Sequence, residues 1–302
     1  MLRLDGMASF VAIAESGSIS EAARRLNLSK SVVSERLAEI ERTLGASLLH
    51  RTTRKVSLTE DGAAFLEKAV RILHDVDDAV ADMAERRGTL SGPLRISAPV
   101  TFGRMHLGPA LYPFLLKHPL LEVTLDLDDR RIDASSEGYD AVIRHGALND
   151  SRLVAWPLAA SQRLLVASPE YLARHGVPVT VGDLQGHRGI FYTNRGTADW
   201  RFEGPNGALM VRVGNALRVN NGDMILDATL AGLGIALLPT FIAGAAIKSG
   251  DLKVIDVGVS TAIESIYVAH PEGRRASAKL KGLVACLRQA FVSPPYWEID
   301  CD

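Results

Sequence analysis

One predicted helix, beginning after Ser29 and ending near Gly45, carries short polar side chains on its outer face. Its other face has a single apolar stripe at helical spacing, formed by Val33, Leu37, Ile40 and Leu44. The outer face presents short polar or small side chains: Lys30, Ser31, Ser34, Glu35 and Ala38. Hydroxyls bond to phosphates or to base edges, and short side chains let a helix approach the floor of the major groove. This face therefore favours DNA binding; the alternative is a helical packing module with a solvated face.

A second cluster of cations follows this helix in the segment "RTTRK", residues 51–55. Short apolar runs, "SLLH" before it and "VSL" after it, predict a small β-hairpin with this segment at the tip. Cations at such a tip suit phosphate oxygens or a narrow minor groove. Local charge agrees, because residues 1–58 hold nine Lys and Arg against six Asp and Glu, whereas residues 59–87 hold four against eight.

Capping signals place these groups in a winged helix-turn-helix over residues 1–58. Ser18 and Glu21 fit a capping box that starts one short helix, and Asn27 can adopt the left-handed conformation that reverses the chain after it. Ser29 then caps the next helix and Gly45 ends it. The predicted DNA-binding residues are Ser18, Ser29, Lys30, Ser31, Ser34, Glu35, Arg36, Arg51, Thr53, Arg54 and Lys55.

A long helix is predicted after Thr59, which is a suitable N-cap. Its apolar residues recur with spacings of three and four, as in a coiled-coil seam: Leu66, Ala69, Leu73, Val76, Val80 and Met83. We expect residues 59–92 to form a dimerisation helix and hinge, which would place two helix-turn-helix units on a palindromic site. The alternative is a helix that packs on the surface of its own domain.

Beyond the linker "ERRGTLSGP", predicted strands and helices alternate over residues 93–302. The order runs from "LRISAP", a helix over 101–117, "LEVTLDL" and "YDAVIR" to "RLLVAS", "GIFYT", "LRVN" and "GIALLP". This alternation predicts an α/β fold of parallel sheets covered by helices. A ligand would bind in the crevice at the carboxyl ends of the strands.

These motifs together resemble the LysR-type transcriptional regulator family. The resemblance is dense over Phe10–Gly62 and continues in order through "LRISAPVTFGRMHLGPAL", "EGYDAVIRHG", "VASPEYLARHGVP" and "DATLAGLGIALLP". It implies a winged helix-turn-helix, a dimerising linker helix and a two-subdomain effector-binding module similar to periplasmic binding proteins.

The resemblance also implies where the chain divides and what it binds. Subdomain I would comprise about 93–162 and 268–302, and subdomain II about 163–267, with crossings near Ala160–Leu164 and Tyr267–Ala269. The partners would be double-stranded operator DNA, further copies of the chain as a dimer or tetramer, and a small co-inducer that changes the DNA contacts.

Two positions depart from the family pattern. Glu35 stands where relatives often carry Arg or Lys, and a carboxylate there can only accept from a base such as cytosine or pair with Arg36. Asn27 stands where relatives tend to have Gly, but Asn tolerates the same backbone. Base specificity is therefore not transferable at Glu35, whereas the fold is.

Candidate effector-binding residues lie at or just after predicted strand ends: Pro99, Val100, Thr101, Phe102, Arg144, Tyr192, Asn194 and Asn220. The Arg144 guanidinium could pair with a carboxylate ligand; the alternative is a salt bridge to Asp129 or Asp140. Thr101 either opens an anion-binding helix N-terminus or is only its N-cap. The expected effector is a small organic molecule, anionic or aromatic.

The sequence lacks the signatures of the competing classes. It has no G-x-S-x-G, S-x-x-K, phosphate loop, H-E-x-x-H or C-x-x-C, and its eight histidines show no short metal-ligand spacing. We therefore expect no catalytic residue, metal or cofactor. A transport solute-binding protein would share the two-lobed sensor, but the opening "MLRLDGMASF" is no signal peptide, so a cytoplasmic location is expected.

Two further segments need an interpretation. The uncharged run Ala228–Ile247 has the length of a membrane span, but Gly232, Gly234 and Pro239 divide it into a helix end, a strand and a helix start, so no membrane partner is expected. The last residues, Ser293–Asp302, are expected to form a loose tail.

Overall fold

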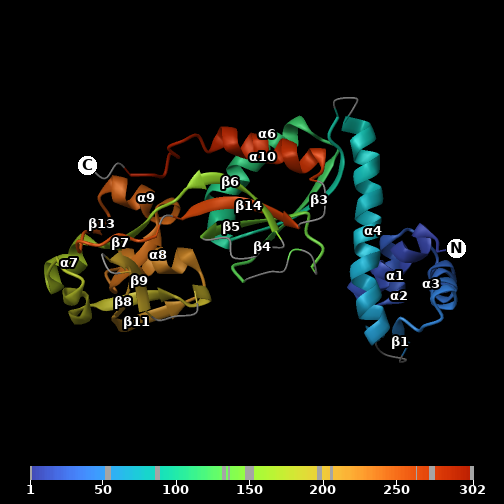
Figure 1. Ribbon diagram of the computed structural model, residues 1–302, viewed down its shortest axis with the longest axis horizontal. Coiled ribbons are helices and arrows are strands. Elements are labelled where there is room, and N and C mark those ends of the chain that lie inside the picture. The colour runs from blue at the N-terminus through green and yellow to red at the C-terminus, as the bar shows by residue number, and fades with distance from the viewer. Residues whose placement is uncertain are drawn as a thin grey trace. The chain divides into compact units, whose positions relative to one another are not determined.

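The computed structural model describes residues 2–51, 56–85, 89–130, 134, 137–146, 153–195, 199–204, 207–262, 264–271 and 276–299 (Figure 1). Contacts divide the chain into two compact units. The N-terminal unit comprises Met1–Pro93 with Ser135–Gly138, and the C-terminal unit comprises Leu94–Ala134 with Tyr139–Asp302.

The N-terminal unit contains three short helices, an antiparallel hairpin and one long helix. They are α1 (Leu4–Ser16), α2 (Ile19–Arg25), α3 (Lys30–Leu44), β1 (Leu49–Arg51), β2 (Val56–Leu58) and α4 (Glu60–Glu85). The Glu21 amide donates to Ser18 Oγ at 3.4 Å, and the Val32 amide donates to Ser29 Oγ at 3.3 Å. Asn27, between them, has φ 53°, the predicted left-handed conformation. Local capping therefore fixes the turn between α2 and α3.

The core of this unit lies between the three short helices. The buried residues of α3 are Val33, Leu37 and Ile40. Phe10 of α1 is fully buried, with its ring centroid 5.6 Å from that of Phe65 on α4. Leu44, predicted to be buried with the α3 stripe, is 37% exposed, so that prediction is wrong. It is the last residue of α3, after which Gly45 takes the left-handed conformation and turns the chain away.

The apolar seam of α4 lies in two environments. Ala69 is fully buried in the core of the N-terminal unit, and Leu66 and Leu73 pack against the same core. Val76 and Val80, further along the helix, are 37% and 66% exposed. The prediction that the whole seam faces a partner helix is therefore wrong for its first half. The a/d spacing also suits a helix that packs on its own unit, so spacing alone did not separate the two roles.

This division of α4 makes a stability prediction. Ala69→Leu should lower the opening free energy of α1 and α4 amides by about 1–3 kcal/mol, because the core has no room for the added atoms. Val80→Leu is the control, since its position is largely exposed and should leave exchange in α1 unchanged. Native-state hydrogen exchange of the two variants measures both effects. Equal changes in the two variants would contradict the division.

Two five-stranded mixed sheets form the two lobes of the C-terminal unit. Lobe I has the strand order β4 (Leu121–Leu127), β3 (Gly92–Ala98), β5 (Ala141–Gly146), β14 (Ser265–Pro271), β6 (Leu153–Ala160). Lobe II has the order β11 (Gly214–Val219), β8 (Arg188–Tyr192), β12 (Ile235–Pro239), β7 (Arg163–Ala167), β13 (Lys253–Ile255).

The mixed pairing corrects the prediction of parallel sheets. β14 is antiparallel to β5 and β6, and β7 is antiparallel to β12 and β13, whereas β3 with β5 and β8 with β11 and β12 are parallel. β7 and β14 are the first strands after each crossing between the lobes. Each of these two strands begins at one crossing, at the end of the sheet where the neighbouring strand before the other crossing finished. Each is therefore antiparallel to its neighbours.

The two crossings lie between Ala160 and Arg163 and between Ile255 and Ser265. The predicted return near Tyr267–Ala269 is wrong, because these residues already pair with β5 and β6 inside lobe I. The chain thus re-enters lobe I at the start of β14.

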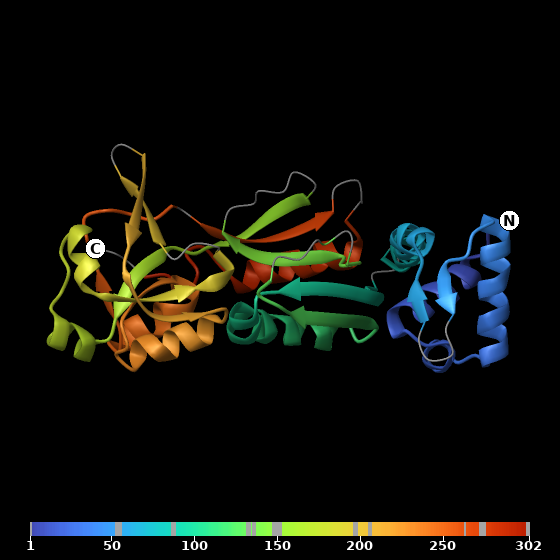
Figure 2. The same ribbon diagram turned by 90° about the horizontal axis from the view of Figure 1, so that it is seen from below.

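Helices cover both sheets of the C-terminal unit. They are α5 (Val100–Phe102), the π-helical η1 (Gly103–Leu107), α6 (Gly108–Lys117), α7 (Pro169–His175), the 3₁₀ turns η2 (Gly182–Gly186) and η3 (Thr193–Arg195), α8 (Gly222–Leu230), α9 (Thr240–Ser249) and α10 (Ala278–Ala290). β9 (Asp199–Gly204) and β10 (Gly207–Arg212) form a hairpin that projects from lobe II (Figure 2).

The uncharged run Ala228–Ile247 folds as predicted into the end of α8, the strand β12 and the start of α9. Gly232, with φ 72°, makes the turn between α8 and β12. Among the helices of the described chain, none is long and apolar enough to cross a membrane.

The C-terminal segment contradicts the expectation of a loose tail. Pro295 and Trp297 are buried, and Trp297 is only 3% exposed. The segment therefore belongs to the packed structure up to at least Glu298.

Candidate nucleic-acid interface and effector site

The outer face of α3 leaves a small set of polar groups available. Lys30, Ser31 and Glu35 are exposed and Ser34 is half-buried. Within the described chain, Lys30, Ser34 and Glu35 have no hydrogen-bond or ion-pair partner, and Ser31 bonds only to Ser29, Oγ to Oγ at 2.9 Å. These side chains can therefore bind an external ligand without breaking contacts that hold α3 in place, apart from that one bond.

Three of the predicted DNA-binding residues have structural contacts instead. Ser18 and Ser29 accept the capping hydrogen bonds of α2 and α3. The Arg36 guanidinium pairs with Asp5 of α1, Nη2 to Oδ2 at 3.4 Å, so it does not pair with Glu35 as the sequence allowed. Arg36 therefore connects α3 to α1. The type of side chain suggested a phosphate contact, but its position on the helix directs it to its own unit.

The hairpin is anchored by an acid that the sequence analysis missed. Glu41 of α3 accepts hydrogen bonds at Oε1 from the Leu48 amide at 2.8 Å and the Leu49 amide at 3.4 Å. Thr59, at the other end of the hairpin, donates from Oγ1 to the Ser47 carbonyl at 2.7 Å. These bonds hold the base of the hairpin against α3. Acids on helices are usually solvated, so nothing in the residue pattern indicated this role for Glu41.

Several predicted DNA-binding and dimerisation residues lie outside the part of the chain that the structure describes. Thr53, Arg54 and Lys55 lie outside the described residues, as do the side chains of Arg51 and Met83. The strands that carry the tip are described, with Arg51 opposite Val56 and Leu49 opposite Leu58.

In the C-terminal unit, Arg144 is the cation that the sequence analysis assigned to the effector site. It lies on β5, and its guanidinium donates to the Oγ of buried Ser97 on β3 at 3.2 Å and to the Ile143 carbonyl at 2.7 Å. Burial lowers the pKa of Arg144, against the opposing pull of Tyr267 and the carboxylates of Asp128 and Asp129. A desolvated guanidinium of this kind favours a carboxylate partner.

Neither of the predicted salt-bridge alternatives supplies that partner. The Asp140 carboxylate accepts from the Arg95 amide at 2.8 Å, and the Asp129 carboxylate accepts from the Val100 amide at 3.0 Å. Asp128 is paired with Arg130, Oδ2 to Nη2 at 2.6 Å. Arg144 therefore forms no ion pair with any residue that the structure describes.

The loop after β3 is organised differently from the prediction. Pro99, not Thr101, occupies the N-cap position of the helical run, and Asp129 supplies the capping carboxylate to Val100. Thr101 is 3% exposed, and its Oγ1 donates to Asp223 Oδ2 at 3.2 Å. Phe102 is buried among aromatic rings, with its centroid 5.5 Å from that of Phe241. Thr101 and Phe102 are therefore structural, and the helix N-terminus already holds an acid of the chain.

A polar bridge joins the two lobes beside this loop. Asn194 donates from Nδ2 to the Asp129 carbonyl at 2.9 Å, and the Tyr192 hydroxyl bonds to the Asp129 carboxylate. Burial and the nearby Asp129 charge raise the pKa of Tyr192 to about 12, and burial raises the pKa of Asp129. Both groups thus favour their neutral forms more than free side chains do.

A second interlobe contact involves an acid that the sequence analysis did not single out. Asp223, in the first turn of α8, pairs with Arg104 of lobe I, Oδ1 to Nη2 at 2.5 Å, and this pair raises the pKa of Arg104. Asn220, a predicted effector residue, is exposed and has no bond to a described residue; its neighbour Asn221 caps α8 by accepting from the Met224 amide at 3.0 Å. Asn221, and not the predicted Asn220, therefore stabilises the start of α8.

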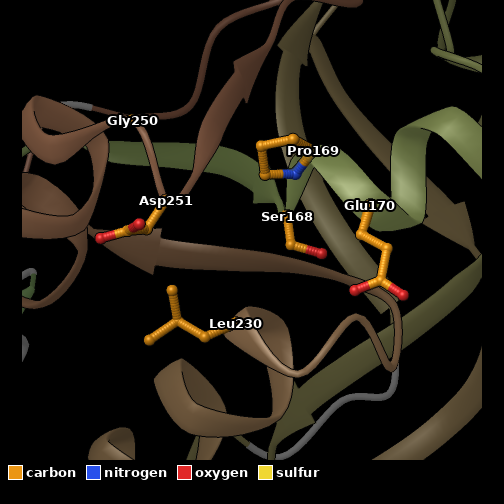
Figure 3. A pocket seen from close by; sticks show the side chains of 6 residues that line it. All are labelled: Ser168, Pro169, Glu170, Leu230, Gly250 and Asp251. Atoms are coloured by element: carbon orange, nitrogen blue, oxygen red, sulfur yellow. The ribbon is translucent and has the colours of Figure 1, made fainter.

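The open depression of lobe II in Figure 3 is a poor alternative site. Its polar groups bond within the chain: Ser168 Oγ accepts from the Tyr171 amide, Glu170 pairs with Arg174, and Asp251 accepts from Ser249. Within the described parts of the chain, no group of His, Cys, Asp and Glu side chains could hold a metal ion.

A winged helix-turn-helix joined to a two-lobed α/β module with polar groups between its lobes defines a DNA-binding protein that responds to a small effector. Two family models match the chain: the bacterial regulatory helix-turn-helix of the lysR family over residues 4–63, and the LysR substrate binding domain over residues 87–292. The chain belongs to the LysR family of transcriptional regulators.

Relatives match along nearly the whole chain. An HTH-type transcriptional regulator of Haemophilus influenzae is 34% identical, over 94% of this chain and 99% of its own. The regulator DmlR of Escherichia coli is 34% identical, over 95% and 94%. The solved structure of CrgA, a LysR-type regulator of Neisseria meningitidis, is 28% identical with a TM-score of 0.61, over 95% and 98%.

The Glu41 anchor makes a prediction about the hairpin. Glu41→Ala should lower the opening free energy of the amides over residues 46–51 by about 1–3 kcal/mol, because two backbone donors lose a charged acceptor. Glu39→Ala removes an exposed acid from the same helix and serves as the matched control. Hydrogen exchange measured on the free protein distinguishes them. Unchanged protection in Glu41→Ala would remove Glu41 from this role.

Proposed function

We propose that α3 reads the major groove of operator DNA through Lys30, Ser31, Ser34 and Glu35, while the hairpin residues Arg51, Thr53, Arg54 and Lys55 contact the DNA backbone or minor groove. The observation that supports this assignment is the freedom of the α3 face, whose exposed polar groups are almost unengaged while Arg36 is tied to Asp5. Such binding takes place where the DNA is, so the compartment inferred for the protein is the bacterial cytoplasm.

Cations elsewhere in the N-terminal unit support the same assignment. Arg24 pairs with Glu21, and Arg25 pairs with Glu15, Nη1 to Oε2 at 2.5 Å. Their charge is partly offset by neighbouring acids, which leaves Lys30 and the hairpin as the main source of attraction for phosphates. Phosphate contacts then supply affinity, and Ser31, Ser34 and Glu35 supply selectivity.

The domain division and self-association are part of the same proposal. Residues 1–58 would bind DNA, residues 59–92 would connect and dimerise, and residues 93–302 would bind the effector. The exposed Val76 and Val80 on the second half of α4 offer the apolar surface for pairing with a second copy, as a dimer or within a tetramer.

The effector proposed for the C-terminal unit is a small organic anion bound through Arg144. The supporting observation is a largely desolvated guanidinium that lacks an ionic partner among the described residues, while the nearby acids are engaged by other donors. Tyr192 and Asn194, which connect the lobes through Asp129, would change their contacts when the ligand enters. Ligand binding would thereby alter how the lobes are held together.

DNA recognition is tested by fluorescence anisotropy on the upstream intergenic DNA and on a scrambled sequence, across a salt series. Specific DNA should bind roughly a thousandfold more tightly than scrambled DNA. Lys30→Ala should weaken both complexes and reduce the salt slope by about one, whereas Lys68→Ala, an exposed lysine of α4, should not. Glu35→Ala should lower the ratio between specific and scrambled DNA without changing the slope. Absence of binding to either DNA at low salt would refute the assignment.

Effector binding is tested by thermal-shift screening against aliphatic and aromatic mono- and dicarboxylates. A carboxylate that stabilises the parent protein should bind Arg144→Ala roughly thirtyfold more weakly or worse, because a buried charge loses its partner. Lys117→Ala is the control, since Lys117 is an exposed cation of the same lobe with no bond to the described acids around Arg144. Equal stabilisation of the parent and Arg144→Ala would exclude Arg144 from the site.

A further inference from the structure

The segment Ser293–Glu298 runs from α10, which packs on lobe I, to α9 of lobe II (Figure 1). The match to the family's effector-domain model ends at residue 292, just before this segment. Its buried Trp297 and its contacts with both lobes are therefore features of this chain that the family description does not account for.

On lobe I the segment is held by hydrogen bonds and ring contacts. The buried His106 ring must donate from Nε2 to the Phe241 carbonyl at 2.8 Å, so its Nδ1 accepts from the Tyr296 hydroxyl at 2.6 Å. Trp297 donates from Nε1 to the Ala160 carbonyl at 3.2 Å, and its ring centroid lies 4.6 Å from that of His106. Burial lowers the pKa of His106, in agreement with the neutral ring that this pattern requires.

On lobe II, α9 contacts the segment at Tyr296, Trp297 and Glu298. Lys248 donates from Nζ to the Tyr296 carbonyl at 2.6 Å, and Thr240 donates from Oγ1 to Glu298 Oε1 at 2.7 Å. A Cβ placed on Gly244 would lie 2.2 Å from the Trp297 carbonyl oxygen. The absence of a side chain at Gly244 therefore allows the segment to lie directly on the helix.

The anchor on α9 is next to the places where the chain crosses between the lobes. The Thr240 amide donates to the Gln162 carbonyl at 2.8 Å, in the first crossing. Arg163, where the first crossing ends, and Glu264, in the second, form a partly buried ion pair, Nε to Oε2 at 2.7 Å. The segment thus spans the hinge region and contacts lobe I, lobe II and the end of β6. Separating the lobes there requires breaking its contacts on one side or the other.

We propose that residues 293–298 form an interlobe strap that limits how far the two lobes of the effector domain can open. Binding of the strap to the lobes is reversible. The buried Glu298 Oε2 has no hydrogen-bond partner among the described residues, so burying this oxygen costs free energy and opposes binding of the strap. Any consequence for regulation rests on the proposed effector function, but the strap itself is a property of the free domain. It can be tested without DNA or ligand.

The test is hydrogen exchange of the full-length protein carrying Gly244→Ala. The added methyl should displace the strap, while alanine favours the helix more than glycine does, so α9 should remain folded. We expect the amides of 296–299 to exchange roughly tenfold faster, together with amides of the crossings over 160–163 and 256–265. Gly186→Ala in lobe II is the matched control, because a Cβ there meets nothing within 4 Å.

Lys248→Met provides a second variant that leaves the backbone packing intact. It removes one hydrogen bond from an exposed side chain and should accelerate exchange in the same segments by about threefold, whereas Lys253→Met, on the exposed face of β13, should not. Faster exchange in the strap with unchanged crossings would overturn the proposal, because the segment would then only fill space. Unchanged exchange in both strap variants would overturn it as well.

Discussion

The central constraint in the effector domain is the half-buried guanidinium of Arg144, which forms no ion pair with any carboxylate that the structure describes. Arg144 is surrounded by acids, but Asp128, Asp129 and Asp140 each accept a hydrogen bond from a backbone amide, and Asp128 also pairs with Arg130. A half-buried cation balanced only at a distance gains free energy from pairing with an anion. One of these acids, Asp129, also holds the loop after β3 and the bridge to lobe II. Engagement of the acids therefore both builds the cleft and leaves Arg144 available.

In the N-terminal unit the cations that hold helices together are paired with acids, whereas the polar groups on the outer face of α3 are left almost without partners. Arg36 is tied to Asp5, Arg25 to Glu15, and Glu41 to the base of the hairpin. Rigid attachment of α3 and the hairpin matters because base contacts discriminate only when the reading side chains are held in register with the backbone contacts. Under the proposed function, the hydroxyls of α3 would depend for their selectivity on these structural ion pairs and hydrogen bonds.

Local sequence signals predicted the local structure well. Ser18, Ser29 and Asn27 cap or turn the chain where the pattern placed them, since capping depends on neighbours within a few residues. Long-range features were not predictable in this way. The acid that caps the run after Pro99 comes from Asp129, and the antiparallel entry of β7 and β14 follows from the crossings between lobes. The adjacent aromatic residues Tyr296 and Trp297 were the available signal that the tail is packed, because large aromatic side chains are stabilised by burial and are unfavourable in a fully solvated segment.

Two kinds of contact hold the lobes of the effector domain together, and they should respond differently to a ligand. The Arg104 and Asp223 pair lies near the surface, where water and salt screen it, so it contributes little to the closed arrangement. The contacts of Trp297 are buried beside the hinge, and the Tyr296 hydroxyl bonds to the buried His106 although Tyr296 itself is 57% exposed, so water and salt screen these contacts less than the surface pair. A ligand at Arg144 changes the balance only through a difference in its affinity for two lobe arrangements. If the strap confines the lobes to a narrow range, that difference must arise from small shifts of Asp129, Tyr192 and Asn194. Under the proposed effector function, these three residues would therefore convert binding energy into a change of domain geometry.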